Sequence, residues 1–225
     1  MKFSRYGMRE MVVGTIVLLV IASLLAWVWW PLALLPVPVL IWLFAFFRDP
    51  ERAIPRDPGI MVSPADGVVS DVKEIESEPL LGGQPAVRVG IFLNIFNVHT
   101  NRAPCDGKVV SVTYKEGKFL NALKHDMVSQ FNESNTIVMA DPVTGVPVCV
   151  VRQIAGAIAR RIICGPSMGQ VVNRGDRIGF IKFGSRTELT IPRSLAPEVL
   201  VKVGDKCVGG TQIIARLGAP ANAIA

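Results

Sequence analysis

The chain has 225 residues, of which 50% are hydrophobic and 19% charged, with a formal net charge of +6 and a mean hydropathy of +0.42. The apolar excess is concentrated in residues 11–47, 37 consecutive positions without Asp, Glu, Lys, Arg or His. This distribution excludes a disordered chain and a multi-domain array, and it disfavours a wholly soluble enzyme. We expect a membrane anchor in residues 1–47, followed by one domain, residues 48–225, that is large enough to bury a core.

The apolar segment is long enough to enter a membrane. A hydrocarbon core about 30 Å thick needs roughly 20 apolar residues in a helix. Residues 11–30 supply one such span, and residues 31–47 supply a second, shorter one after a break at Pro31, Pro36 and Pro38. The run is too long for a cleaved signal peptide, and no small-residue cleavage site follows it.

Both flanks of the apolar segment are basic, with Lys2, Arg5 and Arg9 before it and Arg48, Arg52 and Arg56 after it. Because positively charged flanks prefer the cytoplasm, we expect a transmembrane helical hairpin that leaves the following domain at the cytoplasmic face of the cell membrane. Two passes are favoured modestly over one. A hairpin buried in a protein core is the alternative.

The number and type of the reactive side chains limit the kinds of site and ligand that this protein can have. With two histidines and no clustered carboxylates, a metal site is not expected. The positive net charge suits an anionic membrane surface or an anionic substrate. Nucleic acid is disfavoured because no basic run is interleaved with aromatic residues. Four cysteines without a CxxC pair stand in apolar runs, which predicts small buried thiols in a reducing compartment: Cys105, Cys149, Cys164 and Cys207.

Strand signals dominate after residue 59. Short runs rich in Val and Ile, bounded by Gly, Pro, Asn or Asp, predict strands at 60–62, 67–72, 86–93, 108–114, 136–140, 146–155, 159–164, 177–183, 187–191, 199–203 and 212–216. One helix or helical turn is expected around residues 119–125. So many short strands with frequent turns predict a mainly β domain, a sandwich or a barrel.

Weak internal repeats refine this expectation. Pro64-Ala-Asp-Gly-Val-Val and Pro104-Cys-Asp-Gly-Lys-Val share a pattern at an offset of 40, and Arg174-Gly-Asp and Val203-Gly-Asp are each expected to open a strand, at an offset of 29. Asp-Gly is a signal for a tight hairpin turn, because Gly accepts positive φ and Asp forms local hydrogen bonds. Turns of this kind resemble those of lipoyl-type barrel-sandwich domains, which the sequence therefore predicts.

The dipeptide Gly184-Ser185 permits one unusual chemistry, although a turn is its default interpretation. No lysine stands in the hairpin setting that carries biotin or lipoate, and the hydrolase motif G-x-S-x-G is absent. A Ser hydroxyl can attack the preceding carbonyl, and Gly offers little steric obstruction. The ester that results can eliminate across the serine Cα–Cβ bond, and hydrolysis of the dehydroalanine leaves an N-terminal pyruvoyl group.

This reaction needs a base and a carboxylate that orients it. The available histidines are His99, at a transition from strand to loop, and His125, in a polar stretch. His99 is the stronger candidate, with a structural histidine as the alternative. Asp66 and Asp106 compete as the orienting carboxylate, and spacing does not choose between them.

The chain resembles the short, archaeal-type branch of the phosphatidylserine decarboxylase proenzymes. The resemblance covers nearly all of the second domain, in order. It is carried by Phe46-Phe-Arg-Asp-Pro-Glu-Arg, Val62-Ser-Pro-Ala-Asp-Gly, Phe96-Asn-Val-His-Thr-Asn-Arg, Gly117-Lys-Phe-Leu-Asn-Ala, Gln153-Ile-Ala-Gly-Ala-Ile-Ala-Arg-Arg-Ile and Gly175-Asp-Arg-Ile-Gly-Phe-Ile-Lys-Phe-Gly-Ser-Arg.

The resemblance implies a specific enzyme. Self-cleavage between Gly184 and Ser185 would give a β chain of residues 1–184 and an α chain of residues 185–225, held together as a heterodimer or as part of a higher oligomer. Ser185 would become a pyruvoyl group, with no metal ion or pyridoxal phosphate. Phosphatidylserine, a membrane phospholipid, would form a Schiff base with it and lose CO₂ to give phosphatidylethanolamine in phospholipid biosynthesis. His99 becomes the favoured base, and Asp66 is favoured over Asp106.

One departure qualifies the resemblance. The longer bacterial branch has two histidines three residues apart, of which His99 matches the first, whereas Arg102 stands in place of the second. His99 therefore serves either both self-cleavage and decarboxylation or decarboxylation alone. Cationic candidates for the substrate phosphate and carboxylate are Lys118, Arg160, Arg161 and Arg186.

Two other functions remain open from the sequence. A non-enzymatic, membrane-anchored barrel-sandwich adaptor would explain the anchor and the Gly-Asp turns. The absence of a long heptad hairpin counts against it. A related decarboxylase that acts on another amino-phospholipid would share every motif.

Overall fold

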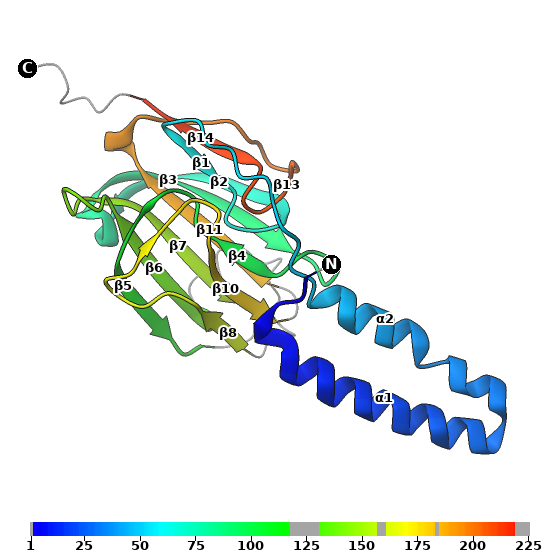
Figure 1. The fold of residues 1–225 in the computed structure, drawn as a ribbon. Coiled ribbons are helices and arrows are strands. Elements are labelled where there is room, and N and C mark those ends of the chain that lie inside the picture. The colour runs from blue at the N-terminus through cyan, green and yellow to red at the C-terminus, as the bar shows by residue number, and fades with distance from the viewer. Residues whose placement is uncertain (1, 118–130, 157–160, 183–184, 219–225) are drawn as a thin grey trace, which may run out of the picture. The chain divides into compact units, whose positions relative to one another are not determined.

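The computed structural model describes residues 2–117, 131–156, 161–182 and 185–218 (Figure 1). The chain divides into two compact units, Met1–Glu51 and Arg52–Ala225. The expected helix at 119–125 lies outside the described residues.

The first unit is a helical hairpin. It consists of η1 (Arg5–Gly7), α1 (Met8–Val28), η2 (Trp30–Leu34) and α2 (Val37–Phe46). The two helices pack closely, since a Cβ on Gly14 would lie 2.7 Å from a methyl of Leu43. The two ends of the hairpin are joined, because Phe3 forms a β-bridge with Arg48 and the Ser4 amide donates to the Phe47 carbonyl (2.8 Å). The residues on either side of the apolar segment therefore meet at one end of this unit.

Only the first helix of this hairpin is long enough to span a membrane, among the described residues. Arg5–Val28 has 24 residues and contains an 18-residue window with a mean hydropathy of 2.7. The ten residues of α2 extend about 15 Å, half of a hydrocarbon core about 30 Å thick. The first helix suggests association with a membrane, and the number of passes stays a prediction.

The second unit is mainly β, as predicted, and is built on one large, curled antiparallel sheet (Figure 1). Its strand order is β13-β2-β3-β11-β7-β6-β5-β9. The strands are β2 (Gly67–Glu78), β3 (Gln84–Leu93), β5 (Gly107–Lys115), β6 (Ser134–Ala140), β7 (Pro147–Ala155), β9 (Val171–Val172), β11 (Ser185–Pro192) and β13 (Lys206–Cys207). Two short helical turns, η3 (Pro79–Leu81) and η4 (Arg193–Leu195), follow β2 and β11.

Two small antiparallel sheets complete this unit. One has the order β1 (Ile60–Val62), β14 (Ile213–Leu217) and β12 (Pro197–Val199). The other has the order β4 (Thr100–Arg102), β10 (Arg177–Lys182) and β8 (Arg161–Cys164). The two small sheets repeat one arrangement, because β1 and β4 each lead through a Pro-x-Asp turn into a strand of the large sheet.

The repeated Pro-x-Asp-Gly turns are not hairpins, which corrects the expectation from the sequence. Each turn transfers the chain from a small sheet to the large one, so the strands on its two sides do not pair with each other. The two turns bond reciprocally: the Val62 amide donates to Pro104 and the Arg102 amide donates to Pro64, both at 2.9 Å. The repeat in the sequence is thus a structural repeat. The closer likeness to a lipoyl-type barrel-sandwich stays a prediction.

Most predicted strands are present, and the misses have local causes. The strand expected at 199–203 is wrong beyond Val199, because the Lys202 amide bonds to the Asp205 side chain (2.9 Å) and Gly204 takes φ +95° in a turn. The strands β4 and β9 were not expected, since two or three residues carry no periodicity. Arg174-Gly-Asp and Val203-Gly-Asp were expected to open strands, and β10 and β13 begin directly after them.

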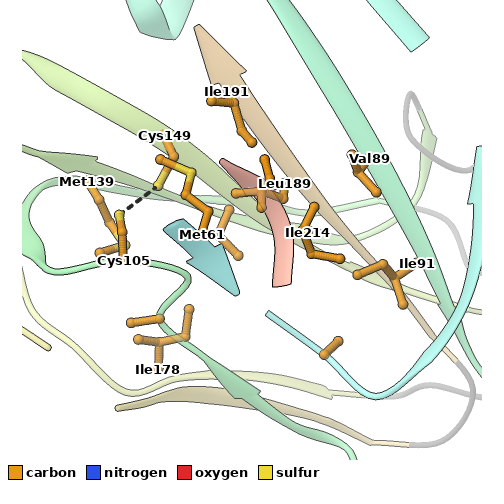
Figure 2. Packing of buried hydrophobic residues seen from close by; sticks show 14 of the residues in the cluster. Met61, Val89, Ile91, Cys105, Met139, Cys149, Ile178, Leu189, Ile191 and Ile214 are labelled. Carbon is orange, nitrogen blue, oxygen red and sulfur yellow. Dashed lines mark hydrogen bonds between the residues drawn. The ribbon is translucent and has the colours of Figure 1, made fainter. Parts of the chain in front are cut away.

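The core lies between the large sheet and the small sheets and contains buried thiols (Figure 2). Cys105 and Cys149 lie side by side with their sulfurs 3.8 Å apart and are not joined by a disulfide. The contact with Cys105 and burial raise the pKa of the Cys149 thiol well above its usual value. Burial raises the pKa of Cys207 to about 11, and burial also raises the pKa of Cys164.

These thiols are expected to resist alkylation in the native protein. A folded-state pKa near 11 leaves roughly one Cys207 thiol in a thousand as reactive thiolate at pH 8, and the fraction rises tenfold with each pH unit. Iodoacetamide labelling followed by peptide mass spectrometry should show slow modification of Cys149 and Cys207 at pH 8 and full modification in denaturant. Rapid labelling of native Cys207 at pH 8 would contradict this assignment.

Candidate active site

Ser185 is the first residue of β11 and is fully buried. Its neighbours in the sheet are Leu93 on β3 and Ala155 on β7. Its Oγ has no hydrogen-bond partner among the residues that the structure describes. Because a buried hydroxyl normally has such a partner, this oxygen is better suited to a reaction than to holding the fold. The other half of the predicted junction, Gly184, lies outside the described residues.

His99 is also fully buried and lies between β3 and β4. Its Nδ1 lies 2.9 Å from the carbonyl oxygen of Asn97. A carbonyl only accepts, so Nδ1 carries the proton and Nε2 carries the basic lone pair of the neutral ring. The ring lies beside Phe180, with centroids 6.1 Å apart. This geometry suits His99 as a general base.

The topology brings His99 and Ser185 to the same end of the domain. The Ile181 amide of β10 donates to the His99 carbonyl (3.3 Å), and β11 begins three residues after β10 ends. Asn101 Nδ2 donates to Thr187 Oγ1 (3.1 Å). Asn101 follows His99 by two residues, and Thr187 follows Ser185 by two. This hydrogen bond therefore fixes the chain that carries the base against the chain that carries the serine.

A row of buried amides supports that hydrogen bond and was not found from the sequence. Asn135 Nδ2 donates to Gln153 Oε1 (2.9 Å), and Gln153 Nε2 donates to Asn101 Oδ1 (2.8 Å). Gly179 leaves room for the row, since a Cβ there would lie 2.5 Å from Gln153 Nε2. The sequence does show Asn and Gln within apolar strand segments, which indicates buried polar groups. It does not show which of these side chains form hydrogen bonds with one another.

Asp66 and Asp106 occupy matching positions in the structural repeat. Asp66 Oδ1 accepts from the Gly209 amide and Asp106 Oδ1 accepts from the Arg174 amide, both at 2.7 Å. Both carboxylates therefore hold a loop. They differ in their surroundings, because the Asp66 side chain is 14% exposed and bonds to Arg52 (2.8 Å), whereas that of Asp106 is 64% exposed. A role of Asp66 in the reaction stays a prediction.

The cationic residues expected to bind the substrate phosphate and carboxylate differ in their burial and in their partners. The guanidinium of Arg186 is fully buried and is paired with Asp71 and Glu188, so it has no access to a lipid headgroup. Arg161 is exposed at the start of β8, opposite Lys182 on β10. Arg102 is buried and donates to the Gly175 carbonyl (2.9 Å), which holds a turn. Lys118, Arg160 and His125 lie outside the described residues.

The site offers no metal-ligand cluster within the part of the chain that the structure describes, where no three His, Cys, Asp or Glu side chains gather. The described residues supply a buried hydroxyl, on Ser185, and a buried imidazole, on His99, and no hydrogen bond joins Ser185 Oγ to another described residue.

Comparison with known proteins gives a consistent result. The family model for phosphatidylserine decarboxylase matches residues 39–215. A protein of Rhodopirellula baltica named phosphatidylserine decarboxylase proenzyme is 44% identical over 214 residues, 95% of this chain and 88% of the relative. A protein of Carboxydothermus hydrogenoformans with the same name is 47% identical over 180 residues, 79% of this chain and 82% of the relative. The chain therefore belongs to the phosphatidylserine decarboxylase family.

Proposed function

We propose that this protein converts phosphatidylserine to phosphatidylethanolamine and CO₂ at a pyruvoyl group made from its own Ser185. The observation that carries the proposal is the buried Ser185 Oγ, which has no partner among the described residues. The family membership and the name proenzyme, which both relatives bear, support it.

Maturation begins with attack of Ser185 Oγ on the carbonyl carbon of Gly184. The amide nitrogen leaves as an amine, so the peptide bond becomes an ester. His99 Nε2 takes the hydroxyl proton and returns it to the amine. Elimination across the Cα–Cβ bond of residue 185 releases the Gly184 carboxylate. Water then replaces the remaining nitrogen as ammonia, which leaves a β chain of residues 1–184 and an α chain of residues 185–225 that begins with pyruvoyl.

The pyruvoyl carbonyl supplies an electron sink, because it forms a Schiff base with the substrate amine and accepts the electrons left when CO₂ departs. His99 donates a proton to the substrate α-carbon, and its buried position limits access of bulk water to that step. Asp66, whose Oδ1 also holds the Gly209 loop, is the proposed carboxylate partner of the base. Because the chain makes its own prosthetic group, the proposal requires neither a metal ion nor pyridoxal phosphate.

The substrate is a membrane lipid, which gives the N-terminal hairpin its role. We place the hairpin in the cell membrane, with both basic flanks and the catalytic domain at the cytoplasmic face. Anionic lipids would attract this basic protein. Arg161, exposed opposite Lys182, is the candidate for the lipid phosphate.

Replacement of the serine gives the first test. Ser185→Ala should remain one chain and lose decarboxylase activity to below detection, because no hydroxyl is available to become the ketone. The wild-type protein should give two masses split at 184/185, with an α chain blocked to Edman degradation. Intact-mass spectrometry and release of labelled CO₂ from phosphatidylserine in mixed micelles measure both. An uncleaved wild-type chain with full activity would refute the proposal.

The two histidines can be compared directly. His99→Ala should slow self-cleavage by about 10²- to 10⁴-fold, because general base catalysis is lost. The matched change His125→Ala should leave cleavage within a factor of two of the wild type. The time course of cleavage of freshly synthesised chain, followed on denaturing gels, measures both rates. Equal cleavage rates for the two variants would exclude His99 as the base of self-cleavage and leave it a role in decarboxylation alone.

The structural repeat supplies a matched control for Asp66. Asp66→Asn and Asp106→Asn each keep an oxygen for the loop amide and remove one negative charge. If the charge of Asp66 assists the base, only Asp66→Asn should lower the rates of cleavage and decarboxylation, by about tenfold. The same assays measure both variants. If both retain wild-type rates, Asp66 only holds its loop.

A further inference from the structure

The residue next to the reactive serine is one of the largest fully buried side chains in the protein. Arg186 is 0% exposed. Alternate residues of a strand face opposite sides, so Arg186 lies on the other face of β11 from Ser185. It therefore cannot act on the substrate, and the mechanism above does not use it.

The Arg186 side chain is held by neighbours on three strands. Its Nε donates to Glu188 Oε1 on β11 (2.9 Å), its Nη2 pairs with Asp71 Oδ2 on β2 (2.6 Å), and its Nη1 donates to Ser70 Oγ. On β3, Gly90 leaves the space that the guanidinium fills, since a Cβ there would lie 2.1 Å from Nη2. Bonds between charged groups such as these are about twice as strong as neutral hydrogen bonds.

The local backbone is arranged around this guanidinium. The register of β2 against β3 shifts between Val69 and Asp71, which marks a β-bulge at Ser70. A bulge redirects the side chains beside it. Arg88 provides a second cation, 3.7 Å from Asp71 and 3.8 Å from Glu188, so two arginines balance two carboxylates.

These contacts cross the boundary that self-cleavage creates. Arg186 and Glu188 belong to the α chain, whereas Ser70, Asp71 and Gly90 belong to the β chain. We propose that Arg186 is a positioning residue that clamps the new N-terminus of the α chain to the β chain, so that the pyruvoyl group stays where Ser185 lay. This inference rests on the proposed self-cleavage at Ser185.

The clamp matters only after the chain is cut. In the precursor, the peptide bonds on both sides hold residue 185 in position. After cleavage, residue 185 is a strand terminus, and termini fray unless they are tied down. A displacement of about 1 Å at a reacting centre can lower a rate by about 100-fold.

The test removes the clamp without leaving a charge unpaired. Arg186→Met combined with Asp71→Asn removes one cation and one anion and leaves Arg88 with Glu188. We expect self-cleavage within about threefold of wild type, and kcat of the mature enzyme lower by about 10- to 100-fold with KM within about threefold. The control is Arg193→Met with Glu74→Gln, which removes another pair between the two chains, 40% and 66% exposed, without change in either rate.

Hydrogen exchange separates a clamp from general packing. In cleaved protein, the double variant should lose protection in the peptide 185–192. On a Ser185→Ala background, which cannot be cut, the same two substitutions should change little. Equal loss of protection with and without the cut would make Arg186 an ordinary packing residue and overturn the proposal. So would an unchanged kcat, or a folded variant that does not cleave. Failure of the wild-type chain to cleave would instead refute the proposed function.

Discussion

The constraint on which the rest of this structure depends is the place of β11 in the middle of the large sheet. Ser185 to Pro192 pair with β3 on one side, and Ser185 to Thr190 pair with β7 on the other. All eight residues are buried. A reactive residue at the start of such a strand is fixed in two directions by backbone hydrogen bonds before any side chain contributes. The sheet thus sets the position of Ser185, and the smaller sheet of β4, β10 and β8 holds the segment that carries His99 at the same end of the domain.

The polar groups on the two faces of this sheet differ in charge. On the face of Ser185, neutral amides from β4, β6 and β7 bond to Thr187 through Asn101. On the opposite face, charged groups surround Arg186. Neutral amides fix geometry without adding charge beside the histidine, whereas ion pairs provide stronger bonds where no proton transfer is proposed. The separation lets one strand carry both kinds of interaction.

The sequence predicted what depends on local pattern and composition. The apolar hairpin, the mainly β class and most strands follow from hydropathy and alternation. The strand β4 did not, because its three residues are ordered by a partner far along the chain. The Pro-x-Asp-Gly repeat was visible, but the sheets that its turns connect were not. His99 stood out as one of two histidines, whereas Ser185 was singled out by the resemblance to a known family. From the sequence, Arg186 was a candidate to bind the lipid headgroup. Its burial depends on Gly90 and Asp71, about 100 residues away, and so could not be read from the local sequence.

The central position of β11 has a consequence for the proposed self-cleavage. In the uncut chain, β11 lies between β3 and β7 while all three strands are covalently linked, so their pairing during folding is intramolecular. A separated α chain would have to meet a β chain in solution and enter a gap in the middle of its sheet, at the far lower concentration of a second molecule. Under the proposed self-cleavage, a cut protein that unfolds would therefore lack the route by which it first assembled. Its lifetime would then be set by the rate at which it unfolds and not by an equilibrium with the unfolded state.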